Sequence, residues 1–369
     1  MKVLLLADPA SSHVIKWANG LLEKGLEISI FGLSSYDRLQ YNAGVKIDIF
    51  AIPQFIKWQA DGSLLKTIYL LALPHLKKKI RDLKPDIIHA HSASSYGLLG
   101  ALSGFQPFVI SVWGNDVYNF PQKSSFLKKV ILYNLKKTDM VFSTSKVMAE
   151  ETKKYTDKNI QVIPFGIDVE KFLPKKTENY FFENDLVIGT IKSIEKKYGT
   201  ENLVRAFKKV KDNHPDIPLK LLIVGRGSMT NYIKSLVKDL GIESDVKITG
   251  FVSYDKIPDY HRMLDIYVAV STEDSESFGV AILEASACEN PVIVSDVGGL
   301  PEVVDNNITG FVIPHSNVDL LAEKIELLLD EDLRQKFGKA GRAKVMNHFK
   351  WEDNLKQMVN NYNQILNIN

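Results

Sequence analysis

Short apolar runs alternate along this chain with longer segments in which apolar residues recur every three or four positions. Residues 3–7 form one run, residues 14–24 have helical spacing, and residues 27–31 form the next run. Such runs predict buried strands, and strands that alternate with helices predict βαβ units in a parallel sheet. Further strands are expected in this half of the chain at residues 47–51, 87–90, 108–112, 140–143 and 161–163.

The alternation is interrupted by a turn-rich segment between Pro164 and Pro174. It then resumes, with strands expected at residues 186–191, 219–224, 246–249, 266–269 and 291–294. A break of this kind marks a domain boundary. We therefore expect an α/β protein with two Rossmann-like, doubly wound domains, residues 1–168 and 169–350, that face a cleft and bind ligands at the carboxyl ends of their strands.

Length and composition are those of a soluble globular protein, with 369 residues of which 45% are hydrophobic and 24% charged. The single cysteine, Cys288, excludes an internal disulfide and suits a reducing cytosol. The run at residues 3–7 is too short for a signal peptide, and no stretch approaches the roughly 20 apolar residues of a membrane span. We expect a cytoplasmic location, on the inner face of the plasma membrane if the protein contacts one peripherally.

Charge is distributed unevenly between the two halves. Residues 1–168 hold 21 Lys and Arg against 14 Asp and Glu, whereas the remainder holds 25 against 30. A basic amino-terminal half favours an anionic membrane surface or a phosphorylated acceptor as partner, and we expect no nucleic-acid partner. Two basic amphipathic stretches, residues 76–84 and 126–137, fit docking on anionic lipid headgroups and fit solvated helix faces equally well.

Candidate chemistry begins with two carboxylates, Glu276 and Glu284, which have seven residues between them. Gly279 allows a close backbone turn, and residues 280–287 contain no helix breaker. The amide groups that open such a helix would face an anion such as a diphosphate, with one carboxylate before the turn and the other inside the helix. Alternatively, Glu276 is a charge favoured by the helix dipole and Glu284 a solvated or core-edge residue.

The next segment repeats this pattern of strand, turn and helix. Residues 291–302 form an apolar run followed by the Gly298-Gly299 turn and a new helix start. Together, residues 276–302 resemble the signature of family four of the retaining GT-B glycosyltransferases, including its pair of glutamates separated by seven residues. The resemblance spans essentially the whole chain and is strongest between residues 188 and 310.

This resemblance implies a retaining glycosyltransferase, of hexosyl- or N-acetylhexosaminyl-transferase type, that moves a sugar from a nucleotide sugar to a hydroxyl of a glycan or lipid-linked acceptor. Bacterial surface polysaccharide or glycoconjugate synthesis is the expected setting. The first domain would bind the acceptor and the second the nucleotide sugar, and the last helix, within residues 351–369, would cross back to the first domain. A sugar-nucleotide epimerase of the same fold and a non-catalytic sugar-nucleotide-binding protein stay open as alternatives.

In the family, a glycine turn, here at Gly189, precedes one basic residue, and a lysine follows five residues later; Lys192 and Lys197 match these two positions in spacing. By this resemblance both lysines grip the leaving diphosphate, where preorganised positive charge stabilises the transition state. They would do so without a metal ion, so no cofactor is expected, and no carboxylate pairing suited to Mg²⁺ is apparent. The leaving phosphate itself would take the acceptor's proton. Glu276 would then contact the transferred sugar and perform no acid–base chemistry.

The remaining donor-binding candidates surround these residues. Glu284 is placed to accept hydrogen bonds from the ribose hydroxyls, as acidic residues do in other dinucleotide folds. Arg226 follows a strand and a glycine, where it either contacts the donor or lies on the surface. The complete set of donor-binding candidates is Gly189, Gly225, Arg226, Phe251, Val252, Ser277, Phe278, Gly279, Val280 and Glu284.

The amino-terminal domain matches the family less closely. Its first loop lacks the paired glycines common there, and Trp113 stands where many members have a histidine near the donor sugar. Trp113 either stacks on a sugar or belongs to the core. His89 and His91 share one side of a strand because two positions separate them. We expect His89 in the interior and His91 near the acceptor, with no third ligand for a metal. The acceptor or cleft candidates are Ser11, Ser12, His13, His91, Trp113, Asn115 and Asp116.

Overall fold

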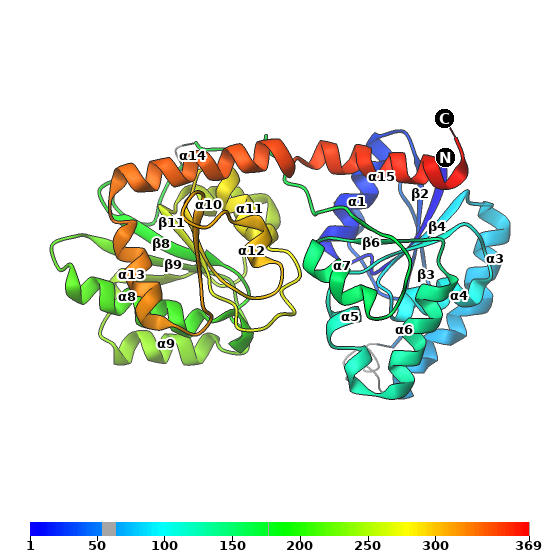
Figure 1. Ribbon diagram of the computed structural model, residues 1–369, viewed down its shortest axis with the longest axis horizontal. Coiled ribbons are helices and arrows are strands. Elements are labelled where there is room, and N and C mark those ends of the chain that lie inside the picture. Colours follow the sequence, from blue (N-terminus) through cyan, green and yellow to red (C-terminus); the bar gives the residue numbers. More distant parts are fainter. Residues whose placement is uncertain (54–63, 176, 369) are drawn as a thin grey trace. The chain divides into compact units, whose positions relative to one another are not determined.

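The computed structural model describes residues 1–53, 64–175 and 177–368, and the chain forms two compact units (Figure 1). Unit 1 comprises Met1–Pro164 and Asp353–Asn369, and unit 2 comprises Phe165–Glu352. The change of unit after Pro164 falls at the start of the turn-rich segment between the two prolines. The last helix, α15 (Trp351–Leu366), belongs to unit 1 from Asp353 onward.

Unit 1 contains a sheet whose described strands are all parallel, in the order β3-β2-β1-β4-β5-β6-β7. The strands are β1 (Lys2–Leu6), β2 (Glu27–Gly32), β3 (Lys46–Ile49), β4 (Ile87–His91), β5 (Phe108–Ser111), β6 (Met140–Ser143) and β7 (Ile160–Val162). Each expected strand of this half is present, with ends that differ by at most two residues. The strand order reverses between β1 and β4.

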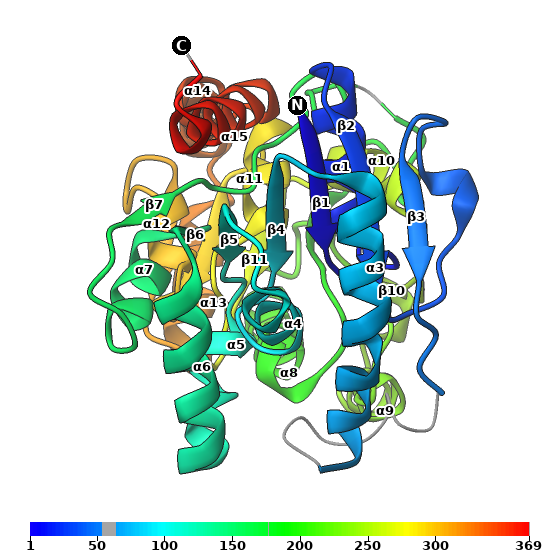
Figure 2. The same ribbon diagram turned by 90° about the vertical axis from the view of Figure 1, so that its right-hand side faces the viewer.

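Helices cover both faces of the unit 1 sheet, as expected for strands such as β4 that are buried along their whole length. The described helices are α1 (Ser12–Glu23), α3 (Leu73–Leu83), α4 (Ser95–Ser103), α5 (Asn115–Tyr118), α6 (Ser125–Lys137) and α7 (Lys146–Lys153), with 3-10 turns η1 (Arg38–Gln40), η2 (Leu64–Ala72) and η3 (Pro121–Lys123). Helices α3, α4 and α6 lie side by side (Figure 2). Their core includes Ile88 and Ala90 of β4, whereas His89 of the same strand contacts Tyr362 of α15.

Unit 2 contains the second parallel sheet, in the order β10-β9-β8-β11-β12-β13 among its described strands. These are β8 (Leu186–Ile191), β9 (Leu219–Val224), β10 (Val246–Ile248), β11 (Ile266–Ala269), β12 (Val292–Ser295) and β13 (Gly310–Ile313). The five expected strands are present, and β13 is an addition. The strand order reverses between β8 and β11.

The unit 2 sheet is also covered by helices on both faces. Helices α8, α9 and α13 pack on one face and α10, α11 and α14 on the other (Figure 1). The elements are α8 (Thr200–Asn213), α9 (Thr230–Asp239), α10 (Ile257–Arg262), α11 (Val280–Ala287), α12 (Leu300–Val303), α13 (Val318–Leu327) and α14 (Glu331–His348), with 3-10 turns η4 (Lys196–Tyr198), η5 (Glu243–Asp245) and η6 (Tyr254–Lys256). The expected fold class, two doubly wound α/β units, is confirmed.

Candidate active site

The loops that carry the charged candidates of unit 2 meet where its strand order reverses. Lys192 follows β8, and Glu276 lies in the loop that follows β11, the neighbouring strand. In open α/β sheets, the crevice outside the carboxyl ends of strands at such a reversal is the usual ligand site. The topology thus brings together two residues that are 84 positions apart in the sequence.

Lys192 and Glu276 form an ion pair, with Lys192 Nζ 2.6 Å from Glu276 Oε2. Both side chains are partly buried. The Lys192 ammonium also lies 4.6 Å from the centre of the Tyr198 ring, and the Lys197 ammonium lies 5.0 Å from the same centre. A ring face attracts cations, so Tyr198 holds two positive charges close together at the edge of the sheet.

The Lys197 backbone is fixed by the strand beside it. Its carbonyl accepts a hydrogen bond of 2.8 Å from the amide of Thr272, which follows β11. Gly199 has φ +68°, and a Cβ atom there would lie 2.0 Å from the carbonyl oxygen of Val270. Only glycine suits that approach, which brings η4 against the loop after β11.

A pocket of about 280 Å³ opens beside Lys192 and contains five of the donor-binding and catalytic candidates. The Arg226 guanidinium lies 5.1 Å from the centre of the exposed Phe251 ring. Gly225 has φ +146°, and a Cβ atom there would lie 2.0 Å from the carbonyl oxygen of Lys192. The lining residues are Ile191, Lys192, Ser193, Val224, Gly225, Arg226, Phe251, Val252 and Ile257.

Helix α11 begins directly behind Glu276, as expected. Gly279 has φ +104°, and a Cβ atom there would press on the side chain of Ile282 at 2.9 Å. No side chain caps the helix at Gly279. The first turn of α11 therefore presents backbone amides and the positive end of the helix dipole beside Glu276 and Lys192.

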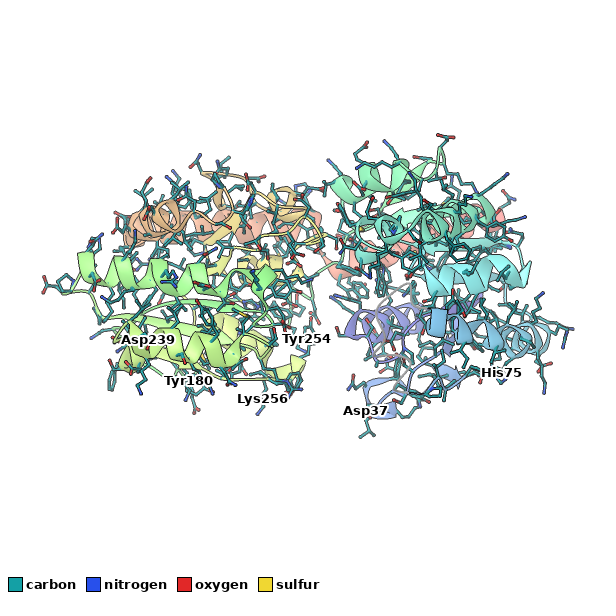
Figure 3. The ribbon with its side chains drawn as sticks, turned by 90° about the horizontal axis from the view of Figure 1, so that it is seen from below. Asp37, His75, Tyr180, Asp239, Tyr254 and Lys256 are labelled. Atoms are coloured by element: carbon teal, nitrogen blue, oxygen red, sulfur yellow. The ribbon has the colours of Figure 1, made fainter. Side chains whose placement is uncertain are left out.

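Glu284 lies inside α11 and is buried, with 4% of its surface exposed. The Tyr254 hydroxyl donates a hydrogen bond of 2.9 Å to its Oε1 (Tyr254 is labelled in Figure 3). Burial and the Glu284 carboxylate raise the pKa of Tyr254, so the phenol stays a donor. His261 Nε2 lies 3.5 Å from Oε2, and neither nitrogen of this fully buried ring has a hydrogen-bond partner.

A glycine turn after β12 supports the loop that carries Glu276. The Gly298 amide donates to Asp274 Oδ1 at 3.2 Å, and the Gly299 amide donates to the Glu276 carbonyl at 2.8 Å. Gly298 has φ +50°, and a Cβ atom there would lie 2.2 Å from the Glu276 carbonyl oxygen. The glycine turn between β12 and α12 therefore holds the loop that carries Glu276 in place.

One donor-binding candidate, Gly189, has other surroundings than expected. Gly189 does not form a turn but lies inside β8, where a Cβ atom would lie 2.5 Å from the carbonyl oxygen of Leu222. It is a packing residue of the sheet. The Phe278 side chain is 3% exposed and contacts the rings of Phe165 and Phe349, so only its backbone is available to a ligand. Ser277 and Val280 flank this turn as predicted.

In unit 1 the histidine candidates lie at the reversal between β1 and β4. The rings of His89 and His91 are 4.5 Å apart, which confirms that they share one side of β4. His89 is buried, and its nitrogens pair with Tyr362 Oη at 2.6 Å and Ser111 Oγ at 2.7 Å. Its expected interior role is confirmed. Burial, followed by the charge of His13, lowers the pKa of His91 to about 3.

Trp113 packs among these histidines. Its ring centre lies 4.9 Å from that of His91 and 5.9 Å from that of His13, in the first turn of α1. Ser11 and Ser12 flank the start of α1, and Asn115 opens α5. Asp116 was expected to face a ligand but is buried. Its two oxygens accept hydrogen bonds from backbone amides of Ala93, Trp113 and Gly114.

Sequence reasoning missed the aromatic and histidine partners of the charged residues, namely Tyr198, Tyr254 and His261. It also missed Glu195, whose carboxylate accepts hydrogen bonds from the amide and hydroxyl of Ser228 and so joins the loops after β8 and β9. The contact between Tyr198 and Lys197 could have been predicted, because the two residues are adjacent in the sequence. The others are distant in sequence from the groups they contact.

Residues 173–344 match the family model described as "Glycosyl transferases group 1", and residues 2–145 match the model "Glycosyl transferase 4-like". Among curated proteins, the chain is 29% identical over 294 residues to the N-acetyl-alpha-D-glucosaminyl L-malate synthase of Bacillus anthracis, a match that covers 76% of this chain and 75% of that protein.

Solved structures with the same fold cover almost the whole chain. A sucrose-phosphate synthase from Thermosynechococcus elongatus aligns with a TM-score of 0.84 and 19% identity, over 100% of both chains. The Anabaena protein HepE, in complex with UDP-glucose, aligns with a TM-score of 0.75 and 18% identity, over 99% of this chain and 100% of that one. These likenesses establish the GT-B fold.

Proposed function

We propose that this chain, a member of the group 1 glycosyltransferases by the match of residues 173–344, transfers a hexosyl or N-acetylhexosaminyl group from a nucleotide sugar to an acceptor hydroxyl, with retention of anomeric configuration. The proposed acceptor is a glycan or a lipid-linked intermediate in bacterial surface polysaccharide or glycoconjugate synthesis. The observation that carries the proposal is the Lys192–Glu276 pair at the strand reversal of unit 2, beside Lys197 and the start of α11.

The donor fits this site in three parts. The diphosphate would lie against Lys192, Lys197 and the first amides of α11, because a helix start and two ammonium groups favour an anion. The transferred sugar would contact Glu276, and the ribose would contact Glu284 inside the same helix. The pocket lined by Arg226, Phe251 and Val252 would hold the base. HepE with UDP-glucose supports a nucleotide sugar as donor.

Bond cleavage leaves a nucleoside diphosphate, so the barrier falls when positive charge already surrounds the leaving phosphate. Lys192 is held in place by Glu276 and the Tyr198 ring before any ligand arrives, which limits the reorganisation needed during the reaction. In our proposal the leaving phosphate oxygen accepts the proton of the attacking hydroxyl. Departure and attack then occur on one face of the sugar, which retains the configuration.

The test is incubation of the purified protein with UDP-glucose, UDP-N-acetylglucosamine and GDP-mannose, each with and without glycan and lipid-linked acceptors. Product NMR would report the anomeric configuration. Transfer with retained configuration is the expected result. An inverted product would contradict retention, an isomerised donor would indicate an epimerase, and binding without turnover would indicate a non-catalytic protein.

We also propose a cytoplasmic location with docking of unit 1 on anionic lipid, by the exposed face of α6. This face contains three exposed apolar side chains and four lysines, and α6 contains no acidic residue. No described helix is long and apolar enough to span a bilayer. Helix α3 is less suited, because its Lys79 pairs with Asp48 at 3.3 Å. The α6 face comprises Phe126, Lys128, Lys129, Leu132, Tyr133, Lys136 and Lys137.

Vesicle flotation tests this docking. Each lysine near an anionic surface contributes about 1 kcal/mol, so reversing Lys128, Lys129, Lys136 and Lys137 to Glu should abolish binding to phosphatidylserine vesicles. The matched control reverses Lys153 and Lys154 of the α7 region, whose ammonium groups pair with glutamates on the same helix. Equal flotation of both variants would remove the membrane proposal and leave the glycosyltransferase proposal untouched.

A further inference from the structure

The loop that follows β4 in unit 1 is strained and tightly held. Ser92 has φ +139°, a conformation that non-glycine residues rarely adopt. The buried Asp116 carboxylate accepts a hydrogen bond of 2.7 Å from the Ala93 amide. Buried Asn134 donates from its Nδ2 to the carbonyls of Ala93, at 2.9 Å, and Ser94, at 3.2 Å. Backbone strain persists where surrounding structure overdetermines it, and such places cluster at functional sites.

The strained residue comes directly after His91, whose polar ring is incompletely satisfied. His91 is 4% exposed, and its Nδ1 is buried without a hydrogen-bond partner. Buried polar atoms are paired in most proteins, so an unpaired one at a strand end needs an explanation. The Trp113 indole packs on this ring at 4.9 Å, and His13 approaches the indole edge-on at 5.9 Å.

These three rings lie at or after the carboxyl ends of β1, β4 and β5, which are neighbours in the sheet of unit 1. His13 follows β1, His91 ends β4 and Trp113 follows β5. The order of the sheet reverses between β1 and β4, and ligands bind outside the carboxyl ends of the strands at such a point. The location, the strain and the unpaired nitrogen are separate observations that coincide. We call this group the His91–Trp113 shelf, consisting of His13, His91, Ser92 and Trp113.

The two buried ionisable groups at the shelf, His91 and Asp116, present no unpaired charge to a ligand. Burial lowers the pKa of His91 to about 3, so its ring is neutral near pH 7. The oxygens of Asp116 are occupied by three backbone amides, and burial raises the pKa of that carboxyl. Unit 2 differs, because lysines and glutamates line its reversal. A shelf of imidazole, indole and hydroxyl groups suits hydroxyls and a weakly polar ring face.

We infer that the His91–Trp113 shelf binds the acceptor through a neutral sugar ring, which packs on the Trp113 indole while one ring hydroxyl hydrogen bonds to His91. This inference rests on the proposed glycosyltransferase function and specifies its acceptor class. It predicts an uncharged sugar next to the attacking hydroxyl, in contrast to the L-malate named for the Bacillus anthracis relative. Because the indole packs on His91, a ligand that reaches Nδ1 must shift Trp113.

Tryptophan fluorescence provides the test. Wild-type protein is titrated with the methyl glycosides of glucose, galactose, mannose and N-acetylglucosamine, and separately with L-malate. At least one glycoside should change the emission, and the change should disappear in Trp113→Ala while persisting in the control Trp351→Phe. Loss of the ring contact should weaken binding about tenfold. His91→Phe should lose the response, and His91→Gln, which keeps a hydrogen-bonding group, should retain part of it.

Two results would overturn the inference. One is a response to malate and to no glycoside. The other is a glycoside response that Trp113→Ala leaves unchanged. Nucleoside diphosphate binding, measured by calorimetry on the same proteins, distinguishes failure of the shelf inference from failure of the proposed function. The variants should bind the nucleotide as wild type does, because the base, ribose and diphosphate contacts belong to unit 2. If wild type binds no nucleoside diphosphate, the proposed function fails instead.

Discussion

Glu284 provides the sharpest test of the donor site, through the preference for ribose over 2′-deoxyribose. An ionised carboxylate has about four lone-pair positions. The Tyr254 hydroxyl occupies one of them on Oε1, at 2.9 Å, and His261 makes no hydrogen bond to Oε2. The carboxylate therefore keeps acceptor positions on both oxygens, enough for the two neighbouring ribose hydroxyls. The perturbation is Glu284→Gln, which preserves the shape and removes the charge.

The magnitude follows from the burial of Glu284. A hydrogen bond to a charged group contributes about 1.5–3 kcal/mol, whereas a neutral one contributes about 0.5–1.5 kcal/mol. Wild-type protein should therefore bind a nucleoside diphosphate about 10- to 150-fold more tightly than its 2′-deoxy form. In Glu284→Gln this preference should fall to about 2- to 12-fold. The affinity for the 2′-deoxy form should change less than the affinity for the ribose form.

Isothermal titration calorimetry measures both affinities for UDP, GDP and ADP. Glu323→Gln is the matched control, because Glu323 lies on the exposed side of α13 and its loss should leave the preference unchanged. Thermal unfolding of each variant checks that the fold survives. The ribose assignment is refuted if wild type binds both forms equally well, or if Glu284→Gln keeps the full wild-type preference.

Three further predictions concern charge. Lys197→Ala should slow transfer about 10²-fold or more, and exposed Lys196→Ala should have little effect; equal rates for both variants would contradict the phosphate assignment. Transfer should continue undiminished in excess EDTA, because the two lysines and the start of α11 supply the positive charge; loss of activity that Mg²⁺ restores would contradict this. Burial depresses the pKa of His89 and His91 in the folded state. Their contribution to the free energy of unfolding should therefore be fully present above pH 6.5 and should fall as the pH drops toward 3, by up to about 1.4 kcal/mol per pH unit for each histidine. Urea titrations at several pH values measure the slope of the unfolding free energy against pH. His91→Gln should reduce this slope by the contribution of one histidine, and an unchanged slope in that variant would contradict the prediction.

The strands could be predicted because apolar runs bounded by turn residues leave few alternatives. Each expected strand is present, but β13 was missed. Its four residues follow the polar turn around Asn306 and Asn307, and a run this short carries little periodic signal. Gly189 shows the opposite error, since a glycine within a strand and a glycine in a turn look alike in sequence. Only the contact with the Leu222 carbonyl identifies it as a packing residue.

The candidate site could be predicted in its location but not in its contacts. Strand ends place Lys192 and Glu276 at one edge of the sheet, because parallel strands share that edge. Their direct pairing at 2.6 Å depends on which strands are neighbours, and that order is a property of the whole sheet. The Tyr254 hydroxyl and His261 reach Glu284 from α10 and the turn before it. No spacing rule links these elements to α11.

The two units place different kinds of candidate residues at the same position of one topology. Each sheet reverses its strand order once among the described strands, and in each the candidate residues follow the strands at that reversal. In unit 2 the loops bring charges together, and glycines at 199, 225 and 298 allow backbone to lie against backbone. In unit 1 the loop after β4 makes a comparable turn with Ser92, at φ +139°. Hydrogen bonds between this loop and the buried side chains of Asp116 and Asn134 stabilise the strained conformation. Replacing Asn134 by Leu should therefore disturb the His91–Trp113 shelf without touching the nucleotide site. Reduced glycoside binding with unchanged nucleotide affinity would show that the strained loop, and not Trp113 alone, shapes the shelf.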